Sequence, residues 1–228
     1  MEADVQRPPA SRTRLICWLA LVGSVSLLEY AARFSSSGQS SGSTRDQVYR
    51  YSTFASGIVF YAVILGVALA IAHDRTDLLA IRLPRGPVLP RVLGVLGVIF
   101  LWEYVVVLLP VRNPGNEQGL TPTHWESAHA GAFAVNLLLF VVIAPIVEEL
   151  TFRGLGQSLL LQFTGRWPSI ALVGIFFGLW HGLVQALLVL IPFGAGLAYL
   201  RDRTNSVVPG MVVHALFNAT ALAVAVAA

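Results

Sequence analysis

The chain has 228 residues, of which 56% are hydrophobic and only 12% are charged, and its mean hydropathy is +0.71. Soluble domains carry about 25% charged residues, so this composition excludes an ordinary soluble domain and predicts an integral membrane protein. The net charge of +3 forms no basic stripe, which argues against a nucleic-acid partner, and the single Cys17 excludes an intrachain disulfide or a paired-cysteine metal site.

Three apolar runs are expected in the first part of the chain, at 15–32, 52–72 and 92–109. Each has about the 20 residues that cross the roughly 30 Å hydrocarbon layer. We interpret the first run as an uncleaved anchor, because no small-residue cleavage site follows it. A Ser/Gly-rich loop at 34–48 and an Arg-rich amphipathic segment at 74–91, read as an interfacial helix or loop, separate the three runs.

The second part of the chain is almost continuously apolar after a polar loop at 112–129, in which Asn113-Pro-Gly and Thr121-Pro are turn signals. Prolines interrupt two of its runs, and we expect polar groups of other helices to bond the carbonyls that Pro145 and Pro192 leave free. The runs lie at 131–163, 169–181, 183–200 and 207–225. The fold class predicted is all-α, a polytopic membrane helical bundle of about seven to eight transmembrane segments.

All 15 basic residues are arginines, and their distribution predicts the orientation. Arginines are enriched in cytoplasmic loops. With the N-terminus inside the cell, 11 of the 15 arginines lie on the cytoplasmic side. We therefore expect a multi-pass protein of the cell membrane with a cytoplasmic N-terminus, and the compact, lysine-free chain looks bacterial.

The first cluster of ionisable residues inside an apolar run is Glu148-Glu149-Leu-Thr-Phe-Arg153. Such residues are costly in lipid and functional by default. Glu149 and Arg153 are four apart with the acid first, so they share a helical face and pair. Glu148 points about 100° away and keeps a free carboxylate, which suits a general base. The alternative is a helix end at the interface with both charges solvated.

The second cluster is a histidine at the end of a glycine ridge. Gly174, Gly178 and Gly182 are spaced four apart, a pattern that lets helix backbones approach closely. His181 ends this ridge. A lone buried histidine is more often structural than catalytic, so its significance depends on the other clusters.

The third cluster is His214-Ala-Leu-Phe-Asn218. The four-residue spacing places the imidazole and the carboxamide on one face, where they offer two donors to an oxyanion. The alternative is a hydrogen bond between helices, worth about 0.6–2 kcal/mol.

A depth estimate predicts that the three clusters meet. At about 1.5 Å per residue, His214 lies about 16 Å from Arg203 and His181 about 22 Å from Arg166. Glu148 lies about 27 Å from Arg166 along a straight helix, and less along a kinked one. The clusters therefore reach a similar level in the bilayer.

Taken in order, these three motifs resemble the CPBP family of CAAX proteases and bacteriocin-processing proteins, the intramembrane glutamic endopeptidases of the Rce1 and Abi types. The resemblance divides the chain into N-terminal membrane helices and loops at 1–129 and a catalytic helical core at 130–222. It implies a helical, CAAX-protease-like core with a conical cavity. It also implies an endopeptidase that acts on a membrane-associated peptide or protein, with no cofactor and no metal.

The resemblance also implies a role for each motif residue. Glu148 and His181 would activate the attacking water, and His214 and Asn218 would stabilise the oxyanion. Glu149, paired as above, would have a supporting role. Arg153 would share that role as its partner.

Three other functions stay open at this point. A metal-dependent protease is one, because two histidines and a glutamate suit Zn²⁺, although the His-Glu-x-x-His pattern is missing. A non-enzymatic immunity or peptide-binding protein is the second. A proton-coupled transporter is the third, although the chain has no internal repeat. Glu29 and Glu103 also lie in apolar runs, and neither is assigned to the site.

Overall fold

The computed structural model describes residues 12–36, 47–109, 122 and 124–227, and within these ranges it is helical and contains no strand. The Ser/Gly-rich part of loop 34–48 and the turns at Asn113 and Thr121 lie outside the described residues. The α-helices are α1 (Arg12–Ser36), α2 (Tyr51–Ala72), α3 (Val88–Leu108), α4 (Ala130–Leu138), α5 (Ala144–Glu149), α6 (Gln157–Thr164), α7 (Arg166–Trp180), α8 (Leu187–Thr204) and α9 (Val208–Ala227).

Helices α4 to α6 form one continuous rod, which confirms the single long run expected around Pro145. Two π-helical segments, Leu139–Ile143 and Leu150–Gly156, join the three helices. Short 3₁₀ turns precede α2, follow it and precede α4, at Gln47–Tyr49, Thr76–Leu79 and Ser127–His129. Because π segments are rare and gather at functional sites, the two that flank α5 single out its acidic residues.

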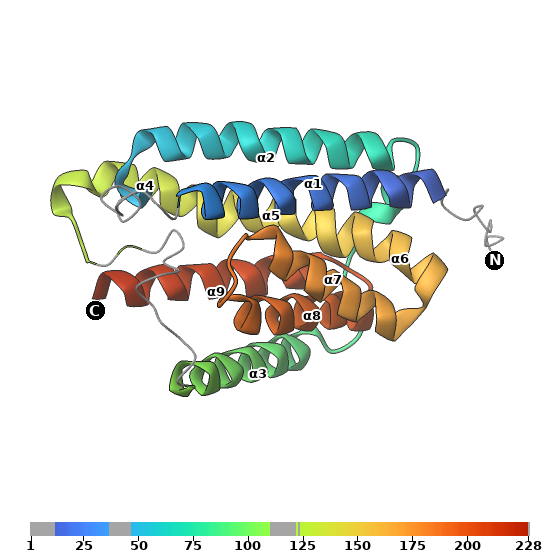
Figure 1. Ribbon diagram of the computed structural model, residues 1–228. Helices are drawn as coiled ribbons and strands as arrows, with labels where there is room; N and C mark the ends of the chain where they lie inside the picture. Colours follow the sequence, from blue (N-terminus) through green and yellow to red (C-terminus); the bar gives the residue numbers. More distant parts are fainter. Residues whose placement is uncertain (1–11, 37–46, 110–121, 123, 228) are drawn as a thin grey trace.

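The rods run alternately in opposite directions, so that the described chain makes seven helical passes (Figure 1). Five rods are long and apolar enough to cross a membrane: α1, α2, α3, α4 to α6 together, and α9. Helix α7 is apolar but shorter, and α8 ends in Arg201 and Arg203. The expected all-helical, multi-pass membrane fold is confirmed.

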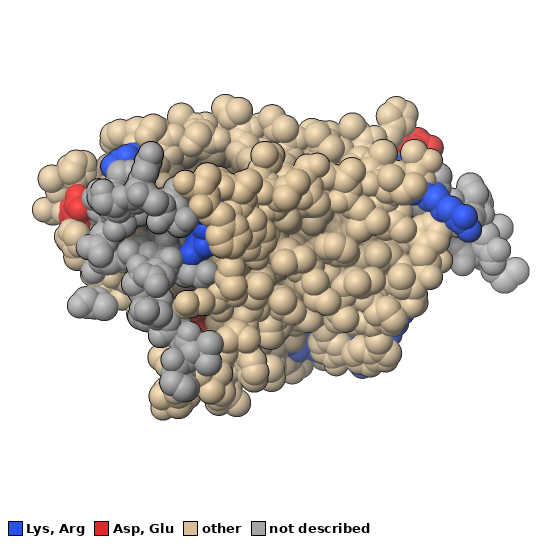
Figure 2. Space-filling view, in the orientation of Figure 1, with Lys and Arg blue, Asp and Glu red and all other residues tan. Residues whose placement is uncertain are grey.

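The outer surface suits a bilayer. On the face shown in Figure 2, a broad surface without charged side chains lies between the charged groups near the two ends of the molecule. Large apolar side chains on α2 and α3, such as Val59, Val63, Leu101 and Leu108, are exposed. In hydrocarbon these side chains replace water contacts with lipid contacts, so their exposure favours membrane insertion.

The alternating passes bring the arginine-rich ends together. One end of the bundle contains the start of α1 and the loop between α2 and α3. The loops between α6 and α7 and between α8 and α9 lie at the same end (Figure 1). Described arginines at this end include Arg14, Arg82, Arg166 and Arg203. The structure thus groups most described arginines of the predicted cytoplasmic side at one end, whereas Arg153, which was counted on that side, is buried inside the bundle.

Residues 74–87 form a loop with one 3₁₀ turn rather than a helix lying in the interface, and residues 88–91 of the predicted segment belong to α3. Leu78 and Leu79 are buried against the protein, whereas Leu83 is 90% exposed. The Val207 amide donates to the Ala80 carbonyl, which fastens the loop to the start of α9. Of the two predicted forms the loop is correct, because backbone bonds to the α8–α9 connection replace the bonds of a continuing helix.

The glycine ridge of α7 allows the close approach that its spacing predicts. A Cβ atom on Gly174 would lie 2.8 Å from the Ile191 carbonyl oxygen, and one on Gly178 would lie 2.6 Å from the Ile191 side chain. Gly182 does not belong to this contact, because it lies in the turn after α7 and faces α1. Helices α7 and α8 therefore form a tight hairpin, and the core beside it contains residues from both halves of the chain.

Both internal prolines leave a carbonyl that a side chain of another helix bonds. Pro192 has no N–H for the Leu188 carbonyl one turn earlier, and Trp102 Nε1 donates to that oxygen at 2.7 Å. Pro145 follows a π-helical segment, in which its partner five residues earlier is the Phe140 carbonyl. Asn218 Nδ2 donates to that oxygen at 2.8 Å. Side chains of α3 and α9 thus satisfy the acceptors that the two prolines leave.

Candidate active site

The buried ion pair predicted from the first motif is present. Arg153 Nη1 donates to Glu149 Oε1 at 2.8 Å, and both side chains are fully buried. Arg153 Nη2 donates to the Gly194 carbonyl at 3.0 Å, and its guanidinium carbon lies 4.2 Å from the ring centroid of Phe177. Helix α5, the following π segment, α7 and α8 thus meet at one guanidinium group.

Glu148 is also buried, with 4% of its surface exposed. The sequence predicted a free carboxylate here, whereas the structure gives it a hydrogen-bond partner. Tyr61 of α2 donates its hydroxyl hydrogen to Glu148 Oε1 at 2.8 Å. No motif pointed to Tyr61. The available signal was a hydroxyl group in the middle of the run at 52–72, whereas the run's other hydroxyls, Ser52, Thr53 and Ser56, lie near its start. This contact makes α2 part of the site.

His214 lies between the two acids. Its Nδ1 atom is 3.1 Å from Glu149 Oε1, and its Nε2 atom is 3.7 Å from Glu148 Oε2. An ionised carboxylate only accepts hydrogen bonds, so Nδ1 carries the hydrogen that it donates to Glu149. The Nε2 distance is too long for a direct hydrogen bond, which leaves Nε2 and Oε2 facing each other across a narrow gap.

His181 ends α7, and its orientation is fixed by its own helix. The Nδ1 atom lies 2.8 Å from the Phe177 carbonyl oxygen. Because a carbonyl only accepts, Nδ1 carries the hydrogen and Nε2 of the neutral ring has the free lone pair. The ring centroids of His181 and His214 lie 4.8 Å and 5.6 Å from that of Phe177, so one aromatic ring supports both imidazoles.

Asn218 lies one helical turn beyond His214 on α9. Its described contact is the bond to Phe140 of the π segment before α5, and no contact with Glu148 or Glu149 is described. The structure therefore brings the two acids, Arg153 and His214 into direct contact. Asn218 bonds the rod formed by α4 to α6, one helical turn beyond His214 along α9.

Two glycines explain how closely the backbones pack around these groups. A Cβ on Gly210 would lie 2.7 Å from Glu149 Oε2, so only glycine leaves room for the buried carboxylate there. Gly182 has φ +63°, and a Cβ at this position would lie 2.8 Å from Glu29 Cβ on α1. Glu29 was not assigned to the site from the sequence. In the structure the backbone of Glu29 lies against the turn that follows His181.

The arrangement combines an acid fixed by a tyrosine, a buried ion pair and two oriented imidazoles. A fixed carboxylate and a neutral imidazole with a free lone pair are the groups that remove a proton from water. An imidazole N–H beside them is a donor for a developing oxyanion. Within the described part of the chain, no three His, Cys, Asp or Glu side chains are grouped as a metal site.

Fold and site together define a multi-pass helical membrane protein with ionisable side chains gathered inside the bundle. Residues 130–220 match the family model described as type II CAAX prenyl endopeptidase Rce1-like. This segment, about two fifths of the chain, is therefore similar to Rce1-like CAAX prenyl endopeptidases. No curated protein and no solved structure matches the chain. The matched segment contains all six motif residues.

Proposed function

We propose that this protein is an intramembrane endopeptidase that hydrolyses a peptide bond of a membrane-associated substrate with an activated water molecule. The observation that carries the proposal is the convergence of Glu148, Glu149 and His214 inside apolar helices, with Tyr61 fixing the first of these. Buried acids without a function are disfavoured in lipid, and the family match supplies the reaction class.

In the proposed first step, Glu148 takes a proton from water while the water oxygen attacks the carbonyl carbon of the peptide. The Tyr61 bond occupies Oε1 and leaves Oε2 to accept the proton. His181 assists through Nε2, because its Nδ1 hydrogen is engaged with Phe177. The proton then passes from Glu148 to the leaving amine, which restores the carboxylate as the C–N bond breaks.

His214 and Asn218 are proposed to stabilise the tetrahedral oxyanion. The Nδ1 side of His214 faces Glu149, so its Nε2 atom, when it carries a hydrogen, is the donor available to the oxyanion. An amide nitrogen carries two hydrogens, so Asn218 can bond the Phe140 carbonyl with one and face the oxyanion with the other. Glu149 and Arg153 support His214 by fixing its Nδ1 side.

The orientation follows from the arginine-rich end of the bundle. We propose that this end, with the start of α1, faces the cytoplasm of a cell membrane, because cytoplasmic loops are enriched in arginine. The division of the chain into N-terminal helices at 1–129 and a catalytic core at 130–222 is part of the same proposal.

The test compares peptides released from membranes that carry the wild-type protein, Glu148→Gln or Glu103→Gln. Glu103 is the matched control, a glutamate inside α3 that is outside the three motifs. Loss of a general base lowers rates by about 10²–10⁴-fold, so we expect products with the wild type and Glu103→Gln and almost none with Glu148→Gln.

Two outcomes would overturn this mechanism. Products that persist with Glu148→Gln show that the carboxylate is not the base, and a cellular phenotype that persists without any product favours a peptide-binding or immunity protein. Stoichiometric zinc in the purified protein, with loss of cleavage on chelation, would replace the glutamic mechanism with a metal-dependent one.

A further inference from the structure

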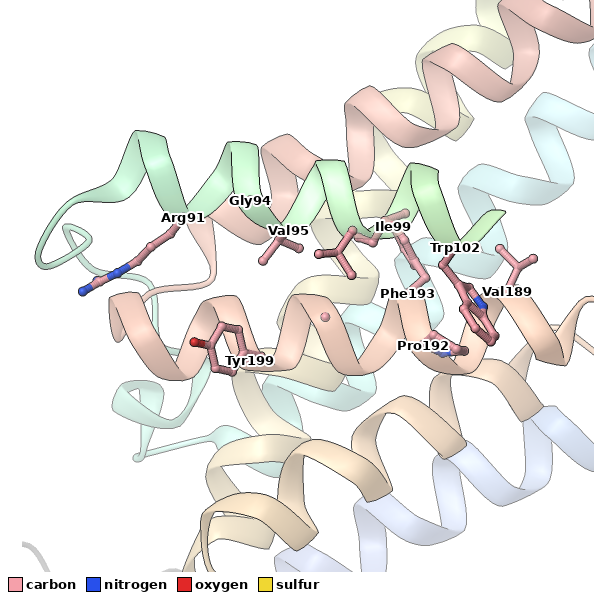
Figure 3. Close-up of a pocket in the computed structure, with 11 residues that line it drawn as sticks. Arg91, Gly94, Val95, Ile99, Trp102, Val189, Pro192, Phe193 and Tyr199 are labelled. Atoms are coloured by element: carbon pink, nitrogen blue, oxygen red, sulfur yellow. The ribbon is translucent and has the colours of Figure 1, made fainter. Parts of the chain in front are cut away.

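An apolar groove of about 660 Å³ lies between α3 and α8, outside the cluster of motif residues (Figure 3). Val95, Ile99 and Trp102 line it from α3, and Pro192, Phe193 and Tyr199 line it from α8. These helices lie at the edge of the bundle, with α3 outermost in Figure 1. An apolar groove in this place opens to the hydrocarbon of the bilayer and suits a hydrocarbon chain.

The length of the groove matches one leaflet. Its α3 wall extends from Arg91 at one end to Trp102 at the other, a distance of about 17 Å at 1.5 Å per residue. Half of a roughly 30 Å hydrocarbon layer is about 15 Å. The groove therefore has the length of a single acyl chain that extends from the membrane surface to the bilayer centre.

The end of the groove at Arg91 is positively charged. Arg91 Nη1 donates to the backbone carbonyls of Arg85 and Arg203 at 2.9 and 2.7 Å, which fixes the Arg91 guanidinium at this end of the groove. The Arg203 guanidinium carbon lies 6.0 Å from the ring of Tyr199, which lines the groove. Basic pockets between membrane helices at the surface bind the head groups of anionic lipids.

We propose that this groove binds an anionic phospholipid, with one acyl chain between α3 and α8 and the phosphate at Arg91 and Arg203. The occupant is one lipid molecule because the groove has the dimensions of one chain and a single charged end. Phe193 connects the two sites: it lines the groove, and its ring centroid lies 5.1 Å from that of His214. Lipid in the groove thus supports the wall against which His214 packs.

Trp102 makes the occupant measurable, because its ring lines the groove (Figure 3). The purified protein is placed in phosphatidylcholine vesicles that contain the same fraction of brominated phosphatidylglycerol or brominated phosphatidylcholine. Subtracting the signal of Trp102→Phe isolates the fluorescence of Trp102. We expect stronger quenching by the anionic lipid. Equal quenching by both lipids would overturn the proposal, because it would show only ordinary contact with the bilayer.

A steric pair of variants locates the chain. A Cβ on Gly94 meets nothing within 4 Å, and Gly94 lines the groove, so Gly94→Phe introduces a ring at the groove wall. Gly97 of the same helix is equally open and is not among the lining residues, so Gly97→Phe is the matched control. We expect the anionic preference to be lost in Gly94→Phe and kept in Gly97→Phe. If the anionic preference is lost in both variants, or kept in both, the lipid lies elsewhere.

A charge pair of variants locates the head group. Arg203→Gln keeps the backbone carbonyl that Arg91 bonds, so it removes a charge and leaves this attachment in place. Arg12→Gln, at the start of α1 and at the same end of the molecule, is the control. One arginine near the surface changes the affinity for anionic lipid by about fivefold, so we expect this loss for Arg203→Gln alone. An unchanged preference contradicts the phosphate position. These readouts do not depend on peptidase activity.

Discussion

The helices before residue 130 and the helices after it differ in the kind of side chain that they bury. Within the described residues, every buried Asn, Gln, Ser, Thr, Glu, Arg and His residue lies after 130, among them Glu149, Arg153 and His214. The earlier helices bury mainly apolar groups, such as Val22 and Ile64, and expose broad apolar faces. The first part thus shields the polar core of the second from lipid.

The helices before residue 130 and those after it also depend on each other. Each of the three earlier membrane helices contributes an aromatic donor to an acceptor of the later part: Trp18 to the Thr151 carbonyl, Tyr61 to Glu148, and Trp102 to the Leu188 carbonyl. Aromatic side chains combine an apolar body with a polar tip, so they satisfy a buried acceptor and remain compatible with a lipid-facing helix. The motif-free helices are therefore part of the site's construction.

The largest effect is expected where the polar core is left with an unpaired charge. Arg153→Met removes the partner of the fully buried Glu149, which costs about 3–5 kcal/mol of unfolding free energy. The double variant Glu149→Gln/Arg153→Met should recover most of this loss. Arg166→Met, which breaks the partly exposed pair with Asp202, should cost less than about 1 kcal/mol. Thermal unfolding in detergent measures all three, and equal losses at the two arginines would contradict the comparison.

A smaller effect is expected when the first part withdraws its donor from the site. Tyr61→Phe removes a hydrogen bond to a carboxylate, worth about 1.5–3 kcal/mol, so kcat should fall about 10- to 100-fold with KM nearly unchanged. Cleavage kinetics on a product found by the peptide comparison measures this. Tyr104→Phe, on the exposed face of α3, is the control. Equal activity of both variants would show that α2 only shields the site.

The attachment of α1 should contribute less again. Trp18→Phe leaves the buried Thr151 carbonyl without its donor, at a cost of about 1–3 kcal/mol. Trp167→Phe changes an exposed ring and should alter stability by less than about 0.5 kcal/mol. Chemical unfolding of the detergent-solubilised protein separates the two variants. If they prove equally stable, α1 lies against the core without support from this bond.

The smallest effect is expected at the arginine-rich end, where α1 meets the loop after α2. The hydrogen bond from Arg14 lowers the pKa of Asp74 below its ordinary value of 3.8. A lowered pKa contributes stability above the unfolded-state value, and this contribution disappears as the pH falls toward the folded-state value. Asp74→Asn should therefore reduce thermal stability slightly at pH 7 and progressively less as the pH falls below 3.8. A loss that persists in acid would show that the contact does not depend on the carboxylate charge.

Much of the fold could be predicted because each helix had to satisfy its own backbone in lipid. The limits of the runs at 52–72 and 207–225 are correct to within two residues. The Glu149–Arg153 pair was also predictable, since a spacing of four sets it within one helix. The segment at 74–91 was less so, because its partners lie on the α8–α9 connection, far along the chain.

The sequence by itself determined that this is a multi-pass helical membrane protein, which ionisable residues lie inside it, and which of them share a helical face. These are properties of hydropathy and of the 3.6-residue period, which act locally along the chain. The tertiary structure decided that Tyr61 holds Glu148, that His214 lies between both acids, and that Asn218 bonds the carbonyl released by Pro145. Such contacts join distant segments, and only the packing of whole helices brings their atoms within hydrogen-bonding distance.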